Sequence, residues 1–214
     1  MAYFPLFVQL DGARCLVAGG GRVAYRKCCL LAEFGAQILA VAPEFCPEMQ
    51  ALAAGQPAVC LARRRALADD AKGMALVVCA TDDPGINREI ADYCKRCRIP
   101  VNVADDKENS TVYFPGIVRQ EDVVLGISTG GRSPAAVKYL RKYLERQMPP
   151  FMGRLVKTLG EFREEIKLSV TEQRQREQLF TELFYEGLAR NGDLPREVLE
   201  KKLGQNEKER EQAE

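Results

Sequence analysis

Short apolar runs alternate with amphipathic helical patterns along the first half of the chain. The runs are short enough to be strands buried on both faces of a sheet, and they cover residues 13–18, 38–42, 75–80 and 99–103. Helical spacing of apolar positions follows from Val23 to Phe34 and from Ile86 to Cys94. This alternation predicts βαβ units with a parallel sheet, a Rossmann-type α/β domain over residues 1–112.

The pattern changes after residue 112. A strand is predicted at residues 123–128, and a helix follows with Ser133 as its N-cap and Pro134 in its first turn. One face of this helix is apolar: Val137, Leu140, Leu144 and Met148. We expect residues 113–148 to form a separate connecting segment and residues 149–203 an all-helical C-terminal part. The tail at residues 204–214 offers nothing to a core and is expected to be disordered.

Composition limits the chemistry that is available to the chain. Its 214 residues include 31 basic and 30 acidic side chains, a net charge of +1 that argues against a nucleic-acid partner. No apolar run approaches the roughly 20 residues that cross a bilayer, so no membrane partner is expected. The chain has no histidine, which excludes a Ser-His-Asp triad and a histidine base. Proton transfer therefore falls to carboxylates, cysteines, lysines, tyrosines or a cofactor.

The eight cysteines all fall within the first 97 residues. A disulfide scaffold is typically short and secreted, and the N-terminus lacks the basic region of a secretory signal, so free thiols in a reducing cytoplasm are expected. Cys94 and Cys97 have the spacing of half a zinc site or a redox motif. Because no second pair accompanies them, inert thiols are the favoured interpretation, and no metal site is predicted.

A glycine motif joins the first predicted strand to the first predicted helix. Gly19-Gly20-Gly21-Arg22-Val23-Ala24 fits G-x-G-x-x-[GA], in which the glycines allow a tight turn and a close approach to a pyrophosphate. The helix N-terminus then offers N–H groups to phosphate. Outside this βαβ context the motif is weak, and a glycine turn without a ligand is the alternative.

Acidic residues follow two of the predicted strands. Glu44, after Pro43, lies 23 residues beyond Gly21, where an acid would bind an adenosine ribose and disfavour the 2′-phosphate of NADP. A solvated turn glutamate explains Glu44 equally well. Asp105 and Asp106 follow the strand at residues 99–103 and could exchange protons with a substrate. From the residues alone, a pair of solvated aspartates is the stronger interpretation.

A second glycine turn precedes the helix capped by Ser133. The turn reads Ser128-Thr129-Gly130-Gly131-Arg132, and it could form an anion nest with Arg132 as an added donor. Residues 113–150 hold six basic and three acidic side chains, a surplus that suits an acidic small molecule. Arg63-Arg64-Arg65 forms another basic cluster, which is interpreted as a solvated face.

Taken together, these motifs resemble the precorrin-2 dehydrogenase family, the N-terminal module of siroheme synthases, some members of which are also sirohydrochlorin ferrochelatases. The matching segments cover residues 3–148 and stand in the family's order. They are Tyr3-Phe4-Pro5-Leu6-Phe7-Val8, the glycine motif with Arg26-Lys27, Ala80-Thr81-Asp82-Asp83 with Asn87, Asn102-Val103-Ala104-Asp105, and residues 128–134. The family often has a serine at the position of Thr129.

The resemblance implies an NAD-dependent oxidation of precorrin-2 to sirohydrochlorin in siroheme or cobalamin synthesis, with Fe²⁺ or Co²⁺ chelation as a second activity. It implies a homodimer formed through residues 113–148 and an active site between the Rossmann-type and helical parts. The family's catalytic aspartate falls on Asp105, which reverses the preference for a solvated pair. The residues expected at NAD are Gly19, Gly20, Gly21, Arg22, Val23, Pro43, Glu44 and Thr81. Those expected at the substrate are Ser128, Thr129, Gly130, Gly131 and Arg132.

A regulatory domain that senses NAD without chemistry is the main alternative. It would use the same glycine turn and a helical dimer arm. It leaves unexplained both Asp105 and residues 129–134.

Overall fold

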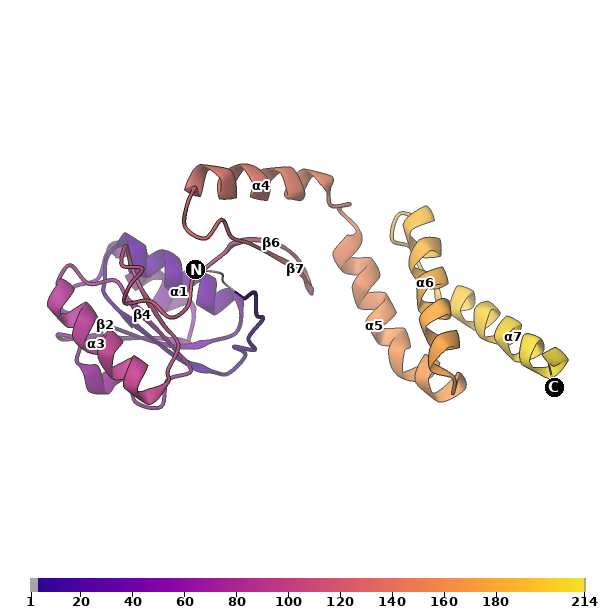
Figure 1. Ribbon diagram of the computed structural model, residues 1–214, viewed down its shortest axis with the longest axis horizontal. Coiled ribbons are helices and arrows are strands. Elements are labelled where there is room, and N and C mark those ends of the chain that lie inside the picture. The colour runs from indigo at the N-terminus through magenta and orange to yellow at the C-terminus, as the bar shows by residue number, and fades with distance from the viewer. Residues whose placement is uncertain (1–3, 214) are drawn as a thin grey trace. The chain divides into compact units, whose positions relative to one another are not determined.

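The computed structural model describes residues 4–213, with side chains described up to residue 205. The chain forms two compact units, Phe4–Phe114 and a second one that begins at Pro115 (Figure 1). No helix within residues 4–213 is both long enough and apolar enough to cross a membrane. The two units carry different parts of the expected site.

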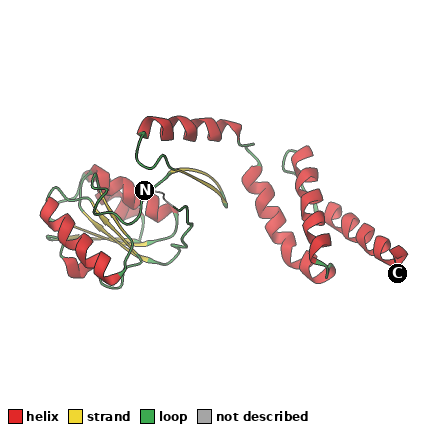
Figure 2. Ribbon diagram, in the orientation of Figure 1, coloured by secondary structure: helices red, strands yellow, loops and turns green. Residues whose placement is uncertain are grey.

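The first unit is a parallel five-stranded sheet with helices on both faces (Figure 2). Its order is β3-β2-β1-β4-β5, so β1 (Arg14–Ala18) is central. β2 (Gln37–Ala42) and β4 (Leu76–Cys79) flank it, and β3 (Val59–Arg63) and β5 (Val101–Val103) are the edges. The order reverses between β1 and β4, and ligands of such sheets bind at this switch point, outside the carboxyl ends of the strands. The predicted α/β class is confirmed.

Strand side chains alternate between two cores, as a sheet covered on both faces requires. One core lies beneath α1 (Arg22–Glu33) and α2 (Pro47–Gly55). The other lies beneath α3 (Pro84–Cys97) and the 3₁₀ helix η1 (Ala68–Ala71). On β1 the two sets are Cys15 with Val17, and Leu16 with Ala18. Double burial explains why the inner strands are apolar runs without polar alternation.

Three elements of this unit are missing from the sequence prediction, namely α2, β3 and η1. Residues 47–63 contain Pro47, Gly55 and Pro57, which interrupt any regular apolar spacing. β3 is an edge strand whose last residue, Arg63, is exposed. An edge strand and a single helical turn bury few side chains, so their sequences carry little periodic signal.

The second unit begins with an antiparallel hairpin of β6 (Gly116–Gln120) and β7 (Val123–Ile127). β7 matches the strand predicted at residues 123–128, whereas β6 is not predicted, because its glycine and polar residues break the apolar run. α4 (Pro134–Gln147) follows with Ser133 as its N-cap, as the sequence indicates; the Ser133 hydroxyl accepts the main-chain N–H of Ala136 at 3.1 Å.

Three further helices complete the second unit: α5 (Met152–Ser169), α6 (Gln173–Ala189) and α7 (Arg196–Ala213). Apolar side chains of α5, α6 and α7 face one core. Its fully buried members include Leu155, Ile166, Leu179, Leu183 and Leu199. The C-terminal part is helical, as the sequence predicts.

Helix α7 continues through most of the segment for which disorder is expected. The expected tail starts at Gly204, whereas the helix runs to Ala213. This segment is rich in Glu, Lys, Arg and Gln, which are good helix formers even without an apolar face to bury. The lack of core-forming residues therefore does not prevent local helix formation. Residue 214 lies outside the described residues.

Candidate active site

The first glycine turn lies between β1 and α1 and is enclosed by main-chain atoms from two other loops. A Cβ at Gly19 would collide with the carbonyl group of Ala80, and one at Gly20 would collide with the carbonyl group of Glu44. Gly19 also has a φ of +130°, which residues with a side chain rarely adopt. Both positions therefore require glycine for the turn to close.

Gly21 is different, because a Cβ there would meet nothing within 4 Å. It is the N-cap of α1 and has no side chain to accept the first N–H groups of the helix; the first turn also lacks acidic residues. Arg22 and Val23 at the start of the helix are exposed. An open helix N-terminus of this kind binds phosphate through its N–H groups and dipole. These residues therefore fit the pyrophosphate of a dinucleotide.

Pro43 and Glu44 lie in the loop after β2, and both are exposed. The loop is fastened to the glycine turn, because the main-chain N–H of Cys46 donates to the carbonyl of Gly20 at 2.8 Å. Glu44 is thereby placed beside the turn at the carboxyl end of β2. This is where an acid binds the adenosine ribose in dinucleotide-binding folds.

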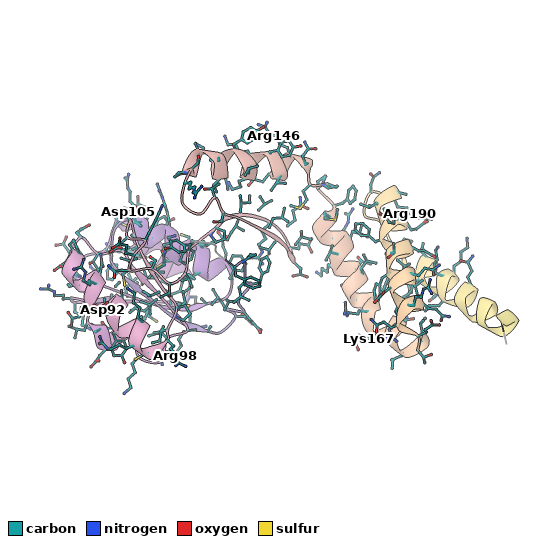
Figure 3. All side chains as sticks on the ribbon, viewed as in Figure 1. Asp92, Arg98, Asp105, Arg146, Lys167 and Arg190 are labelled. Carbon is teal, nitrogen blue, oxygen red and sulfur yellow. The ribbon has the colours of Figure 1, made fainter. Side chains whose placement is uncertain are left out.

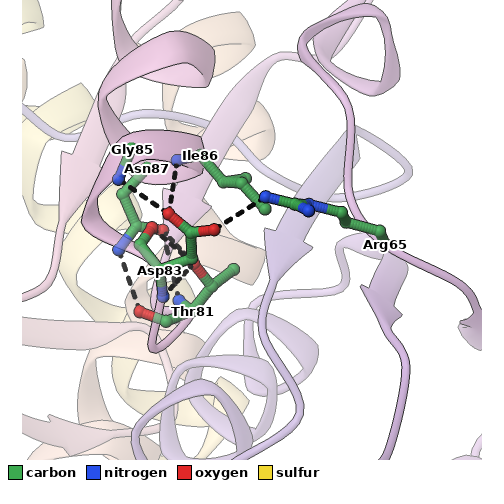
Figure 4. Close-up of polar contacts among 6 residues, drawn as sticks. All are labelled: Arg65, Thr81, Asp83, Gly85, Ile86 and Asn87. Carbon is green, nitrogen blue, oxygen red and sulfur yellow. Dashed lines mark hydrogen bonds and ion pairs between the residues drawn. The ribbon is translucent and has the colours of Figure 1, made fainter.

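Thr81 follows β4, and its main-chain nitrogen lies beside Gly19 of the turn. Figure 4 shows its polar contacts. Its hydroxyl donates to Oδ1 of Asn87 at 2.7 Å, and Nδ2 of Asn87 donates back to the carbonyl of Thr81 at 2.9 Å. The main-chain N–H of Thr81 also donates to Oδ1 of Asn87. Thr81 thus lies beside the turn with its polar groups bonded to the buried Asn87, and cofactor binding by Thr81 stays a prediction. From the sequence, Asn87 is singled out only as part of the resemblance.

Asp105 and Asp106 form a tight turn after β5. The main-chain N–H of Asp106 donates to the carbonyl of Val103 at 3.3 Å, and Asp105 has a φ of +58°. The Asp106 carboxylate accepts the main-chain N–H of Asn109 at 3.1 Å and its Nδ2 at 2.7 Å. These bonds favour the charged form and hold the pKa of Asp106 below its ordinary value. Asp106 therefore braces the loop, whereas Asp105 is exposed at the surface (Figure 3).

Asp105 and the glycine turn share one edge of the sheet. The main-chain N–H of Ala104 donates to the carbonyl of Cys79 at 2.8 Å, so the end of β5 is paired with the end of β4. β4 in turn pairs with β1, which leads into the glycine turn. Two strand spacings of about 4.8 Å separate β5 from β1, so the loop after β5 begins about 10 Å along this edge from the loop after β1.

The second glycine turn belongs to the second unit. Gly130 and Gly131 have φ values of +62° and +72°, and the main-chain N–H of Arg132 donates to the carbonyl of Thr129 at 3.2 Å. Two successive positive φ angles are typical of a type I′ turn and explain both glycines. The Thr129 hydroxyl accepts the main-chain N–H of Ser133 at 3.2 Å, so this side chain holds the turn together. Ser128 and Arg132 are exposed.

The cysteines are all free thiols. Burial raises the pKa of Cys94 to about 11 and the pKa of Cys28 to about 12, so these groups stay protonated at neutral pH. Cys97 is exposed, one helical turn from Cys94. Within the described residues, no group of three or more cysteines and carboxylates is arranged to hold a metal ion.

Comparison with known proteins identifies the first unit. Residues 6–116 match the family NAD_binding_7, whose description is "Putative NAD(P)-binding". The matched range includes the glycine turn, Glu44, Thr81 and Asp105. The chain belongs to this NAD(P)-binding family, and the predicted cofactor class is confirmed.

The chain is also similar to curated siroheme synthases. It is 38% identical over 184 residues to the siroheme synthase of Pseudomonas entomophila (strain L48), and the aligned residues cover 86% of this chain and 40% of the relative. It is 39% identical over 212 residues to the siroheme synthase of Thioalkalivibrio sulfidiphilus (strain HL-EbGR7), and the aligned residues cover 95% of this chain and 42% of the relative. The chain thus spans about 40% of the length of these relatives.

Among solved structures, SirC, a precorrin-2 dehydrogenase, has the same fold. The TM-score is 0.73 at 24% sequence identity, over 94% of this chain and 98% of SirC. This likeness extends over both compact units. The resemblance to the siroheme synthase N-terminal module is confirmed by these comparisons.

Proposed function

We propose that this chain uses NAD to oxidise precorrin-2 to sirohydrochlorin in tetrapyrrole biosynthesis. One observation carries the proposal: the exposed carboxylate of Asp105 lies at the carboxyl edge of an NAD(P)-binding sheet, on the same edge as the glycine turn. The names of the relatives, siroheme synthase and precorrin-2 dehydrogenase, support this choice of substrate.

The oxidation removes one hydride and one proton from the substrate. NAD, when bound, accepts the hydride. Gly20, Gly21 and the first N–H groups of α1 bind its pyrophosphate, and Glu44 accepts a hydrogen bond from the adenosine ribose. Asp105 takes the proton as general base, a role that carboxylates fill in a chain without histidine.

The second glycine turn binds the substrate in this proposal. Precorrin-2 is a polycarboxylate, and Arg132 offers a bidentate donor for a carboxylate. Gly130 and Gly131 keep the turn narrow, so main-chain groups stand close to the ligand. Ser128 adds an exposed hydroxyl, and Thr129 holds the turn in shape.

We also propose that the chain is a homodimer formed through residues 113–148. α4 has no buried residue in the isolated chain. Tyr139 and Tyr143 are 68% and 49% exposed and stack with their ring centroids 6.3 Å apart. Such an aromatic surface on a helix without a fully buried residue is typical of an interface.

Chelation of Fe²⁺ or Co²⁺ by the product is a proposed second activity. In that reaction the metal ion is a substrate, and its entry requires two pyrrole N–H groups to lose their protons. A carboxylate at the position of Asp105 is able to accept them in turn.

Purified protein incubated anaerobically with NAD and precorrin-2 tests the oxidation. Growth of the sirohydrochlorin absorbance together with that of NADH is expected, and neither should appear without NAD. Repeating the assay with Fe²⁺ or Co²⁺ tests chelation by a further spectral change. Binding of NAD without turnover would favour the regulatory alternative.

A further inference from the structure

The three consecutive arginines at the end of β3 have different environments. Arg63 donates through Nη2 to Oε1 of Gln50 at 3.0 Å. Arg64 forms a bidentate pair with Asp70, at 2.8 and 2.5 Å. Both guanidinium groups thus contact a neighbouring element, while all three arginines are exposed, as expected of a solvated face.

Arg65 instead contacts the loop after β4, which borders the glycine turn. Its Nη2 lies 2.7 Å from Oδ2 of Asp83, while Oδ1 of Asp83 accepts the main-chain N–H groups of Gly85 at 2.9 Å and Ile86 at 3.2 Å (Figure 4). Asp83 therefore caps α3 with one oxygen and fixes Arg65 with the other. The Arg65 side chain remains 67% exposed, so the guanidinium is held in place with its surface open.

The position of this ion pair in the topology suggests a role. A dinucleotide-binding sheet consists of two mononucleotide-binding halves, and the strands β1, β2 and β3 form the first, which takes the adenosine end. Arg65 stands two residues beyond the carboxyl end of β3. Asp83 belongs to the same loop as Thr81, whose main chain packs against Gly19. The pair of Arg65 and Asp83 therefore connects the end of β3, in the half that takes the adenosine, to the loop after β4, which borders the glycine turn.

We propose that Arg65 is a cofactor-binding residue whose guanidinium packs on the adenine ring of the bound dinucleotide. The inference rests on the cofactor site proposed above. A guanidinium is planar and weakly hydrated, and it stacks well on aromatic rings. Because Asp83 already fixes Arg65, less side-chain freedom is lost when the cofactor binds.

Cofactor fragments separate this role from others. ADP-ribose contains the adenine and the pyrophosphate, whereas nicotinamide mononucleotide lacks the adenine. Measured by calorimetry on the full chain, Arg65→Ala should raise the Kd of NAD and of ADP-ribose about 3- to 10-fold, the usual worth of a cation–π contact, and leave that of the mononucleotide unchanged. Arg65→Lys keeps the charge without the planar group and should recover less than half of the loss.

Two matched variants complete the test. Arg96→Ala removes another exposed positive charge, at the opposite end of α3, and should leave every Kd unchanged. Asp83→Asn keeps a capping oxygen for α3 but releases Arg65, so it should weaken ADP-ribose binding while the melting temperature stays within a few degrees of the parent value.

The measurements distinguish a failure of the proposed cofactor site from a failure of the role proposed for Arg65. If the parent chain does not bind NAD, the cofactor site itself is wrong. If Arg65→Ala binds ADP-ribose as tightly as the parent chain, the site stands and the role of Arg65 is refuted. An equal loss for ADP-ribose and the mononucleotide, with a lower melting temperature, would show that Arg65 is structural and would also overturn the proposal.

Discussion

Asp105 and Asp106 are neighbours in the chain, yet their carboxylates lie in different settings: both nitrogens of Asn109 donate to Asp106, whereas Asp105 is exposed in a turn with a φ of +58°. Asp106 thus stabilises the loop that presents Asp105. The difference makes Asp106 a matched control for the proposed base.

Asp105→Asn should lower the turnover of precorrin-2 by about 10²–10⁴-fold, the usual contribution of a general base. Asparagine tolerates the left-handed backbone, so the turn should keep its shape. The Kd of NAD should stay unchanged, since the substitution leaves the glycine turn intact. Steady-state kinetics and NAD titration check both statements.

Asp106→Asn should affect turnover far less, because its amide oxygen can still accept the main-chain N–H of Asn109, and its Nδ2 can donate to Oδ1 of Asn109 once that side-chain amide turns over. A wild-type rate in Asp105→Asn would show that the base lies elsewhere. Equal losses in the two variants would show that the pair positions the substrate instead.

Gly21→Asp should abolish NAD binding while the fold is retained. The side chain has space at this position, but it places a negative charge at the phosphate-binding end of α1. Gly20→Ala should instead destabilise the protein, because its Cβ meets the carbonyl of Glu44. Circular dichroism and NAD titration distinguish the two effects. Retained NAD affinity in Gly21→Asp would contradict the placement of the pyrophosphate.

Glu44→Gln should narrow the preference for NAD over NADP. The parent carboxylate would repel a 2′-phosphate, and the amide does not. The Kd of NADP is therefore expected to fall about tenfold or more, while the Kd of NAD rises slightly. Equal affinities for NAD and NADP in the parent chain would refute this role of Glu44.

The protein should sediment as a dimer at micromolar concentration. Replacing Tyr139 and Tyr143 with serine should shift the equilibrium towards the monomer, because it removes the exposed ring stack from α4. Sedimentation velocity measures the shift. A parent chain that sediments only as a species near 23.9 kDa would rule out the dimer.

The ion pair of Arg64 with Asp70 should stabilise the fold in a pH-dependent way. The guanidinium lowers the pKa of Asp70 in the folded state. Such a group adds stability above its unfolded pKa of about 4, and this stability is lost as the pH falls through the folded pKa. Asp70→Asn should therefore cost about 1 kcal/mol of unfolding free energy at pH 7 and less near pH 2. Urea unfolding at both pH values measures the difference, and an equal cost at both would contradict the ion-pair explanation.

The sequence predicts the core of the sheet well. Strands that are buried on both faces, such as β1 and β4, consist of continuous apolar residues, which are visible in the sequence. It also places the glycine turn and the Ser133 cap, since each depends on neighbouring residues. It misses β3 and the pairing of Arg65 with Asp83. β3 is an edge strand with little periodic signal, and Arg65 and Asp83 lie 18 residues apart, so only the fold brings them into contact. The different settings of Asp105 and Asp106 are equally hidden, because they follow from the position of Asn109 in a folded loop.

The enclosure of Gly19 and Gly20 by the carbonyl groups of Ala80 and Glu44 has a consequence for how such a site can diversify. The carbonyl groups of Ala80 and Glu44 set the closest limits on the proposed pyrophosphate cradle, and the Cβ of Ala42 lies next to them. Exposed positions such as Pro43 and Glu44 can therefore exchange residues, and with them the choice of dinucleotide, without reshaping the cradle. The choice of dinucleotide and the binding of phosphate can therefore change independently of each other.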